Sequence, residues 1–197
     1  MANRIGNWLS AAFLVAGVVG CGTTAPSRFY TLDSTATEAP AAPVPRAIVV
    51  GPVSVPGAVD RPEFVIQVAP NRVEIDEFER WAAPLDEAIA RTVVGDLAVL
   101  LGNPQVATDL LANFRPDYRV TIDVQRFESV RSEAALLEAV WVVRATAGGA
   151  PRSGRTVARE AVQGDGFDAL AAAHSRAVAR LSEDIAAAIR TEAEAKR

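Results

Sequence analysis

The spacing of apolar residues predicts an α+β domain, in which a mixed or antiparallel sheet carries two main helices packed on one face. Residues 84–101 and 167–192 repeat apolar side chains at helical spacing. Between them, residues 118–125 alternate apolar and polar side chains, which is typical of a strand with one buried face. Strand-like runs at 135–147 and 155–163 follow, so we expect a meander of three consecutive strands before the last helix.

The first predicted helix has recognisable ends. Pro84 suits the first turn of a helix, and the acidic side chains of Asp86 and Glu87 complement the positive end of the helix dipole. Gly102 follows the last apolar residues and ends the run. The second helix carries one apolar stripe that includes the chain's single histidine, His174.

The segment before the first helix reads as strands and turns. Residues 29–32 form a short β-prone run. Residues 47–55 are β-branched but contain Pro52 and are followed by Pro56, which predicts an edge or bulged strand. Two further runs, 64–68 and 72–75, flank a Pro-Asn turn and predict a hairpin.

Composition limits the domain count and the class of partner. The chain has 197 residues, of which 50% are hydrophobic and 22% charged, so we expect one globular domain. The net charge of −4, without a block of basic residues, argues against a nucleic-acid binder. Residues 33–45, rich in Ala, Pro, Thr and Glu, predict a flexible loop.

The N-terminus has the layout of an export signal. Arg4 supplies a positive charge, Trp8–Val19 an apolar stretch, and small residues precede Cys21. The apolar stretch is shorter than the roughly 20 residues of a transmembrane helix, so a permanent span is the weaker reading. We therefore predict a signal peptide over residues 1–20.

Cys21 is the chain's single cysteine, which leaves no partner for a disulfide within the chain. Val18-Val19-Gly20-Cys21 resembles a bacterial lipobox, and the resemblance implies that Cys21 becomes the acylated first residue of a palmitate-bearing lipoprotein; an idle thiol is the alternative. Residues 21–27 are then a lipidated tether and residues 28–197 the domain. Gly22 is not the aspartate associated with inner-membrane retention, so the resemblance favours the outer membrane.

The search for catalytic chemistry gives no candidate catalytic residue. A Ser-His-Asp triad would need His174, and its place on an apolar stripe favours a packed, hydrogen-bonded histidine over a catalytic or metal-binding one. Ser54 lies between glycines without the spacing of a nucleophile elbow. We find no phosphate-binding loop and expect no cofactor.

Two groups of carboxylates are the candidate metal sites. Asp76, Glu77 and Glu79 are expected in a loop before a helix, and Asp165 and Asp168 at a helix N-terminus. Solvated or capping roles are favoured, because the dense oxygen pattern of a calcium loop is missing. We therefore expect no metal site.

Four segments, taken in order, carry a family resemblance. They are Phe29-Tyr30-Thr31-Leu32-Asp33, residues 48–56, Asp60-Arg61-Pro62 and residues 80–85, which read Arg-Trp-Ala-Ala-Pro-Leu. Together with the lipobox they resemble the ABC-type transport auxiliary lipoproteins, the PqiC/YmbA-like family. The resemblance implies a non-catalytic accessory lipoprotein of an ABC-type lipid transporter that maintains the cell envelope, with a periplasmic MCE-domain protein as partner.

The residues themselves suggest where a partner would bind. Val53, Ser54 and Val55 lie on the predicted edge strand, whose unpaired backbone can accept a strand or loop. Trp81, before the Pro-Leu helix start, is either a core residue or an interface anchor, with core packing favoured. The membrane, through the acyl chains, and a second copy of the chain are further candidate partners; nucleic acid is not.

Two other classes of function stay open. A structural envelope lipoprotein without a transport role would share the anchor and the lack of catalytic residues. An envelope hydrolase would need a pocket that joins His174 to carboxylates.

Overall fold

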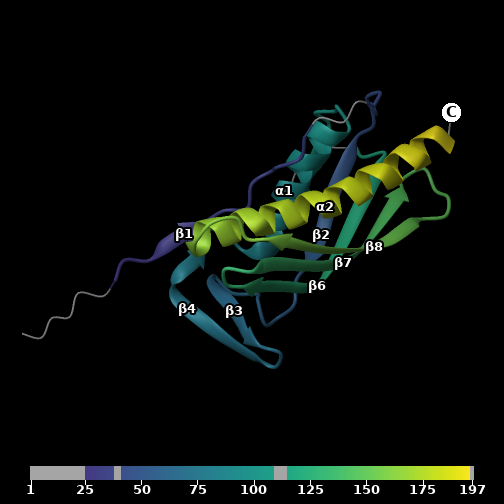
Figure 1. Cartoon of the computed structure of the whole chain (residues 1–197). Helices are drawn as coiled ribbons and strands as arrows, with labels where there is room; N and C mark the ends of the chain where they lie inside the picture. Colours follow the sequence, from purple (N-terminus) through teal and green to yellow (C-terminus); the bar gives the residue numbers. More distant parts are fainter. Residues whose placement is uncertain (1–24, 38–40, 109–114, 196–197) are drawn as a thin grey trace, which may run out of the picture.

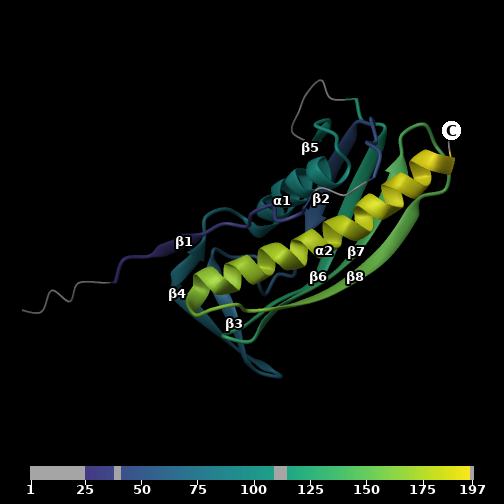
Figure 2. The ribbon, with the colours of Figure 1, turned by 45° about the horizontal axis from the view of Figure 1, so that its top comes forward.

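The computed structural model describes residues 25–37, 41–108 and 115–195. A mixed sheet curls beneath two helices that lie side by side on one of its faces (Figures 1 and 2). The strands are β1 (Arg28–Tyr30), β2 (Ile48–Ser54), β3 (Glu63–Ala69), β4 (Arg72–Trp81), β5 (Val106–Thr108), β6 (Tyr118–Val130), β7 (Ala134–Ala145) and β8 (Arg152–Ala161). The helices are α1 (Leu85–Leu100) and α2 (Gly166–Ala195). The predicted α+β class, with both helices on one face, is confirmed.

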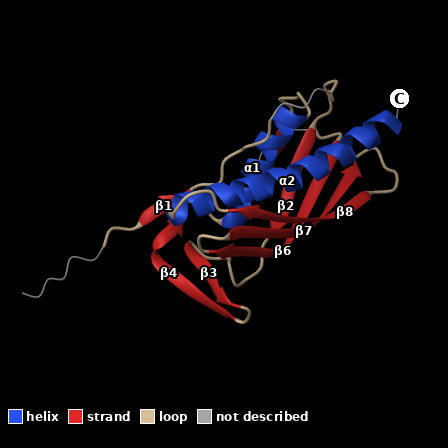
Figure 3. Cartoon of the chain, viewed as in Figure 1, coloured by secondary structure: helices blue, strands red, loops and turns tan. Residues whose placement is uncertain are grey.

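The long strand β6 organises the sheet. β7 pairs antiparallel with β6 along its whole length, and β8 continues the predicted meander. β2 runs parallel to the first half of β6, whereas β3 meets β6 only where Ile66 pairs with Ser129. Because β7 occupies one edge of β6, both β2 and β3 lie along the other edge. The sheet therefore branches there into a β2–β5 arm and a β3–β4–β1 arm (Figure 3).

An irregularity in β6 determines which side chains face the helices. Tyr118 to Val124 alternate as predicted, with the even-numbered residues buried. The register with β7 then shifts between Val124 and Arg126. Because one extra residue inverts the alternation, Phe127 and Ser129 face the helices beyond this point.

Both predicted helices are confirmed. Pro84 occupies the N-cap position of α1, and Gly102, with a φ of 57°, follows its C-cap residue Leu101. α2 runs along β8, and polar contacts join the two at intervals: Glu160 to Arg176 and Arg180, Thr156 to Asp184, and Arg152 to Glu192. Four residues of strand and eight residues of helix both span roughly 12–13 Å, so the contacts recur at the same spacing on β8 and on α2.

The predicted hairpin over 64–75 is β3 and β4, while the predicted edge strand needs a correction. Ile48–Val50 of β2 pair with β6 on one side and with β5 on the other, so this half of the strand is internal. Only residues 51–54 leave one side of β2 unpaired by β5. The register with β6 shifts between Val50 and Val53, around Pro52, which agrees with the bulged strand that was the other predicted form. The predicted edge was wrong for the first half of β2 because β5, three residues long, was not recognised in the sequence.

Candidate functional site

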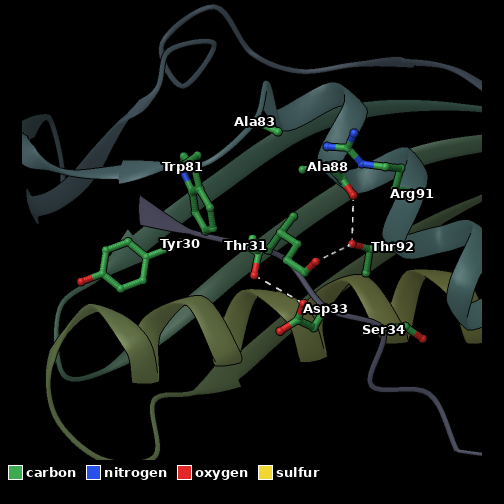
Figure 4. A pocket seen from close by; sticks show the side chains of 10 residues that line it. Tyr30, Thr31, Asp33, Ser34, Trp81, Ala83, Ala88, Arg91 and Thr92 are labelled. Carbon is green, nitrogen blue, oxygen red and sulfur yellow. Dashed lines mark hydrogen bonds between the residues drawn. The ribbon is translucent and has the colours of Figure 1, made fainter. Parts of the chain in front are cut away.

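A groove lies where the chain leaves β1 and passes the start of α1 (Figure 4). Its volume is about 390 Å³. Tyr30, Leu32 and Trp81 give it apolar walls, and Asp33, Arg91 and Thr92 add polar groups. The Thr92 hydroxyl is used by the backbone, because it lies 3.3 Å from the Leu32 carbonyl oxygen and 2.9 Å from the Ala88 carbonyl oxygen. No local sequence pattern predicts this groove, because its walls come from two separate segments, residues 30–34 and 81–92.

Trp81, a predicted partner-binding residue, is 5% exposed and lies in an aromatic cluster. Its ring stacks on Phe64 at 4.2 Å between centroids and meets Phe127 edge-on at 5.9 Å. A second hollow of about 320 Å³ lies beside Asp60 to Pro62 and shares Trp81 with the groove. The Trp81 amide donates to the Pro62 carbonyl at 2.6 Å, and this bond joins the end of β4 to the segment before β3.

His174 extends the same cluster toward α2. The side chain is fully buried, stacks on Phe127 at 4.1 Å, and has its Nε2 2.8 Å from the Ser129 hydroxyl. Burial lowers the pKa of His174 to about 3, so the ring is neutral at pH 7. Nδ1 has no hydrogen-bond partner among the described residues, so no carboxylate orients the ring as in a catalytic triad. The expected packed, hydrogen-bonded histidine is what the structure contains.

Asp96 of α1 is a buried carboxylate that the sequence reasoning missed. One of its oxygens accepts hydrogen bonds from the Ser34 hydroxyl at 2.7 Å and from the amides of Thr35 and Ala36, both at 3.1 Å. The other accepts from the Ser182 hydroxyl of α2 at 3.0 Å. Burial raises the pKa of this carboxyl, and the hydrogen bonds act against that shift. Asp96 thus ties residues 34–36 to both helices.

The loop predicted over residues 33–45 is hydrogen-bonded to the helix layer in both of its described parts. Residues 33–37 and 41–45 contain no helix or strand. The Asp33 amide donates to the Ser175 hydroxyl at 3.1 Å, and the Val44 amide to the Leu101 carbonyl at 3.0 Å. These bonds hold residues 33–37 against α2 and residues 41–45 against the residue that follows α1.

Val53, Ser54 and Val55, the predicted edge residues, lie at the end of β2. Val53 and Val55 are half-buried against the core, while Ser54 is exposed and its hydroxyl donates to Asp123 Oδ1 of β6 at 2.6 Å. Trp81 belongs to a separate strand and faces the core. The structure thus does not merge these four residues into one exposed surface, and their part in partner binding stays a prediction.

The acidic cluster of Asp76, Glu77 and Glu79 was predicted to lie in a loop, and this prediction was wrong. The structure places the cluster in β4. Glu79 accepts a hydrogen bond from the Tyr30 hydroxyl at 2.5 Å and pairs with Arg28 at 3.3 Å, and Asp76 pairs with Arg131 at 3.5 Å. Acidic composition suggested a loop, but pairing with β1 and β3 holds these residues in a strand. Asp165 directly precedes α2, and Asp168 lies in its first turn.

Within the described ranges, no three His, Cys, Asp or Glu side chains gather as metal ligands would. The helices of those ranges also include none that is long and apolar enough to cross a membrane. Cys21 and the predicted signal peptide lie outside the described residues.

The fold and its buried polar groups define an α+β domain whose ionisable core residues serve packing and attachment. The family profile described as "ABC-type transport auxiliary lipoprotein component" matches residues 30–186. The chain belongs to this family, as its sequence motifs predicted. It is therefore a lipoprotein of the cell envelope and an auxiliary component of an ABC-type transport system.

Solved structures share this fold. A Xanthomonas campestris protein of the DUF330 family superposes with a TM-score of 0.72 at 21% identity, over 87% of this chain and 100% of that one. A second structure, described as an uncharacterized protein, gives a TM-score of 0.68 at 20% identity, over 84% of this chain and 99% of the other. The search of curated proteins found no match.

Proposed function

We propose that the chain is a non-catalytic accessory subunit of an MCE/ABC-type lipid transport system, anchored in the outer membrane by acyl chains on Cys21 and facing the periplasm. The observation that carries the proposal is the family match over residues 30–186. The site adds support of its own. Ser34 in the groove donates its hydroxyl to Asp96, whose carboxylate is also held by the amides of Thr35 and Ala36 and by Ser182, so this pair serves attachment. His174 is fully buried against Phe127 and Trp81 and does not line the groove.

The partner proposed is the periplasmic MCE-domain protein, bound at the free side of β2. Val53 and Ser54 pair with β6 on one side and with no described strand on the other, so their outward backbone groups are open to a strand or loop of a partner. Pro52 lacks an amide donor, which limits indiscriminate pairing at this edge. Because both proteins are held in the envelope, a modest intrinsic affinity is sufficient.

Photocrosslinking in intact envelopes tests the partner. A photoreactive residue is placed at Ser54, and a matched one at Ser153, which is exposed on β8 at the other side of the sheet. We expect the MCE-domain protein to be recovered from the Ser54 position and not from Ser153. Crosslinks only to unrelated envelope proteins, with the MCE protein present, would favour a structural envelope lipoprotein instead.

The anchor is tested separately by intact mass spectrometry of the membrane fraction. We expect a mature chain that begins at a triacylated Cys21, and a Cys21→Ser variant that stays unprocessed or is released without acyl chains. A wild-type mature chain that begins elsewhere would refute the proposed lipidation.

A further inference from the structure

We propose that the chain carries a membrane-contact surface on β1 and β4, made by Phe29, Val73, Ile75 and Phe78, and that this surface rests on the bilayer and orients the domain. We call these four residues the apolar face. The inference goes beyond the proposed function, but it rests on that proposal's lipidation of Cys21.

The apolar face stands out by exposure. Phe29 is 65% exposed, Val73 and Ile75 are each 47% exposed, and Phe78 is 37% exposed. These are four of the seven large apolar side chains exposed in the described part of the chain, and they lie on two neighbouring strands. Scattered exposed residues need no explanation, but a contiguous apolar patch marks a contact with a membrane or a protein.

Strand register places Phe29 and Phe78 on the face of the sheet away from the helices. Tyr30 pairs with Trp81, and both are buried under the helices. Their neighbours Phe29 and Arg80, which also pair, must point the opposite way because side chains alternate along a strand. Phe78, two residues before Arg80, points the same way.

The same reasoning adds Ile75 and Val73. Phe64 and Ile66 of β3 are buried against the helices, so Val65 and Gln67 face outward. Val65 pairs with Ile75 and Gln67 with Val73. The register shift between Glu63 and Phe64 keeps Phe78 on the outer side despite its odd spacing from Ile75. The apolar face is thus a stripe roughly 15 Å long on β4 with Phe29 beside it.

The charges near the stripe are largely paired. Arg80 lies 2.8 Å from Glu63, and Arg28 lies 3.3 Å from Glu79. Glu74 and Glu77 on β4 and Arg72 at the end of the hairpin are exposed as well, so these three side chains add one net negative charge near the stripe. A rim of low net charge around apolar side chains suits the boundary between headgroups and acyl chains.

The length of chain before β1 identifies the bilayer as the occupant. Six residues, 22–27, separate Cys21 from Arg28. At roughly 3.3–3.6 Å per residue, this tether keeps Arg28 within about 25 Å of an acylated Cys21. Phe29 is the next residue, so the apolar face belongs to the end of the domain that cannot leave the membrane surface.

Contact at this end would set the direction of the rest of the domain. β1 and the start of α2 lie at one end of the molecule, and the C-terminal end of α2 lies at the other (Figures 1 and 2). With the apolar face on the bilayer, the helix layer lies on the side of the sheet away from the membrane. The acyl chains supply the anchoring, and the apolar face supplies the orientation.

The test uses the full acylated protein in vesicles of phosphatidylethanolamine and phosphatidylglycerol that contain a brominated lipid. Single-cysteine variants Phe29→Cys and Phe78→Cys carry an environment-sensitive fluorophore, and acylated Cys21 has no free thiol to react. Val157→Cys is the matched control, because Val157 on β8 is 66% exposed and lies outside the apolar face. Ile75→Cys replaces any variant whose thermal melt differs from that of the control.

We expect about twofold quenching at positions 29 and 78, because a contacting probe lies within the roughly 5–10 Å boundary layer of the bilayer. Quenching at position 157 should be close to that of a water-soluble probe. Equal quenching at all positions in an acylated, vesicle-bound protein overturns the inference alone. A photoreactive crosslinker attached to the Phe78→Cys variant in the same vesicles also overturns the inference if it joins a second copy of the chain in place of lipid. A chain that carries no acyl mass and does not float with vesicles overturns both proposals.

Discussion

Asp96 and His174 form a natural comparison, because each is an ionisable side chain with no exposed surface and each belongs to one of the two helices. Asp96 is surrounded by donors from the segment after β1 and from α2. His174 has one hydrogen bond and lies against Phe127 and Trp81. Asp96 attaches a polar segment to the helices, whereas His174 fills space in an aromatic cluster.

The physical cause of their pKa shifts is the same, but the directions are opposite. Burial disfavours the charged form, which raises the pKa of Asp96 and lowers that of His174. Shifted pKa values often mark catalytic sites. Here the two groups occupy separate surroundings, and each is explained by packing. For these two groups, the shifted pKa follows first from burial.

The largest expected effect concerns the apolar residues that bury these groups. Leu97→Ala next to Asp96, or Leu181→Ala on α2, should each lower the free energy of unfolding by about 2–5 kcal/mol, because both side chains are fully buried and leave a cavity. Val99→Ala, 37% exposed on the same helix as Leu97, is the control. Urea unfolding measures all three. A core variant that unfolds like the control would show that the core is misplaced.

Asp96→Ala should lower the free energy of unfolding by about 2–4 kcal/mol, because several donors lose their acceptor at once. Part of the loss is offset, since alanine removes the cost of burying a carboxylate. Glu87→Ala, exposed on the same helix, should change little. Faster proteolysis near residues 34–36 should accompany the loss in Asp96→Ala alone. Unchanged stability would contradict the attachment described for Asp96.

The pH dependence of stability should separate the two groups. Below its ordinary pKa of 6.5 the unfolded chain binds a proton at His174 that the folded chain binds only near pH 3. Stability therefore falls as the pH falls through this window, by at most about 1.4 kcal/mol per pH unit. Asp96 acts with the opposite sign, because its raised pKa makes the folded chain the better proton acceptor above pH 3.8.

Urea unfolding of the wild type and of His174→Phe between pH 7 and pH 4 measures this contribution. Phenylalanine keeps the ring contact with Phe127 and removes the titrating group. The variant should lose part of the acid sensitivity, whatever its stability at pH 7. Parallel pH curves for the two proteins would mean that His174 is accessible to protons in the folded state.

The periodic elements could be predicted because each buries one face against one layer. The stripes of both helices, the alternation of β6 and the Pro-Asn hairpin carry their signal within the element itself. β5 was not predicted, because three residues are too few to show the alternation of apolar and polar side chains that identifies a strand. The continuation of β4 beyond residue 75, through Asp76 and Glu79, was not predicted, because the residues that pair with it are Arg131, Tyr30 and Arg28, which lie far away in sequence.

The candidate sites depend more on tertiary contacts and were harder to predict. The groove is assembled from distant segments, and the apolar face becomes visible only through strand register. Asp96 did carry a local signal, since it falls between Val93 and Leu100 on the buried stripe of α1. An acid at such a position predicts a buried partner. His174 was predicted correctly because it lies on the apolar stripe of α2.

The central claim is that this lipoprotein acts by binding an MCE-domain partner while its buried ionisable residues serve the fold. Co-purification from detergent-solubilised envelopes tests it with three variants. Ser54→Lys at the free side of β2 should reduce recovery of the MCE-domain protein about tenfold, because an edge lysine opposes strand pairing. Ser153→Lys on β8 and His174→Phe should recover it as the wild type does. Loss with His174→Phe but not with Ser54→Lys, or no recovery by the wild type, would contradict the account.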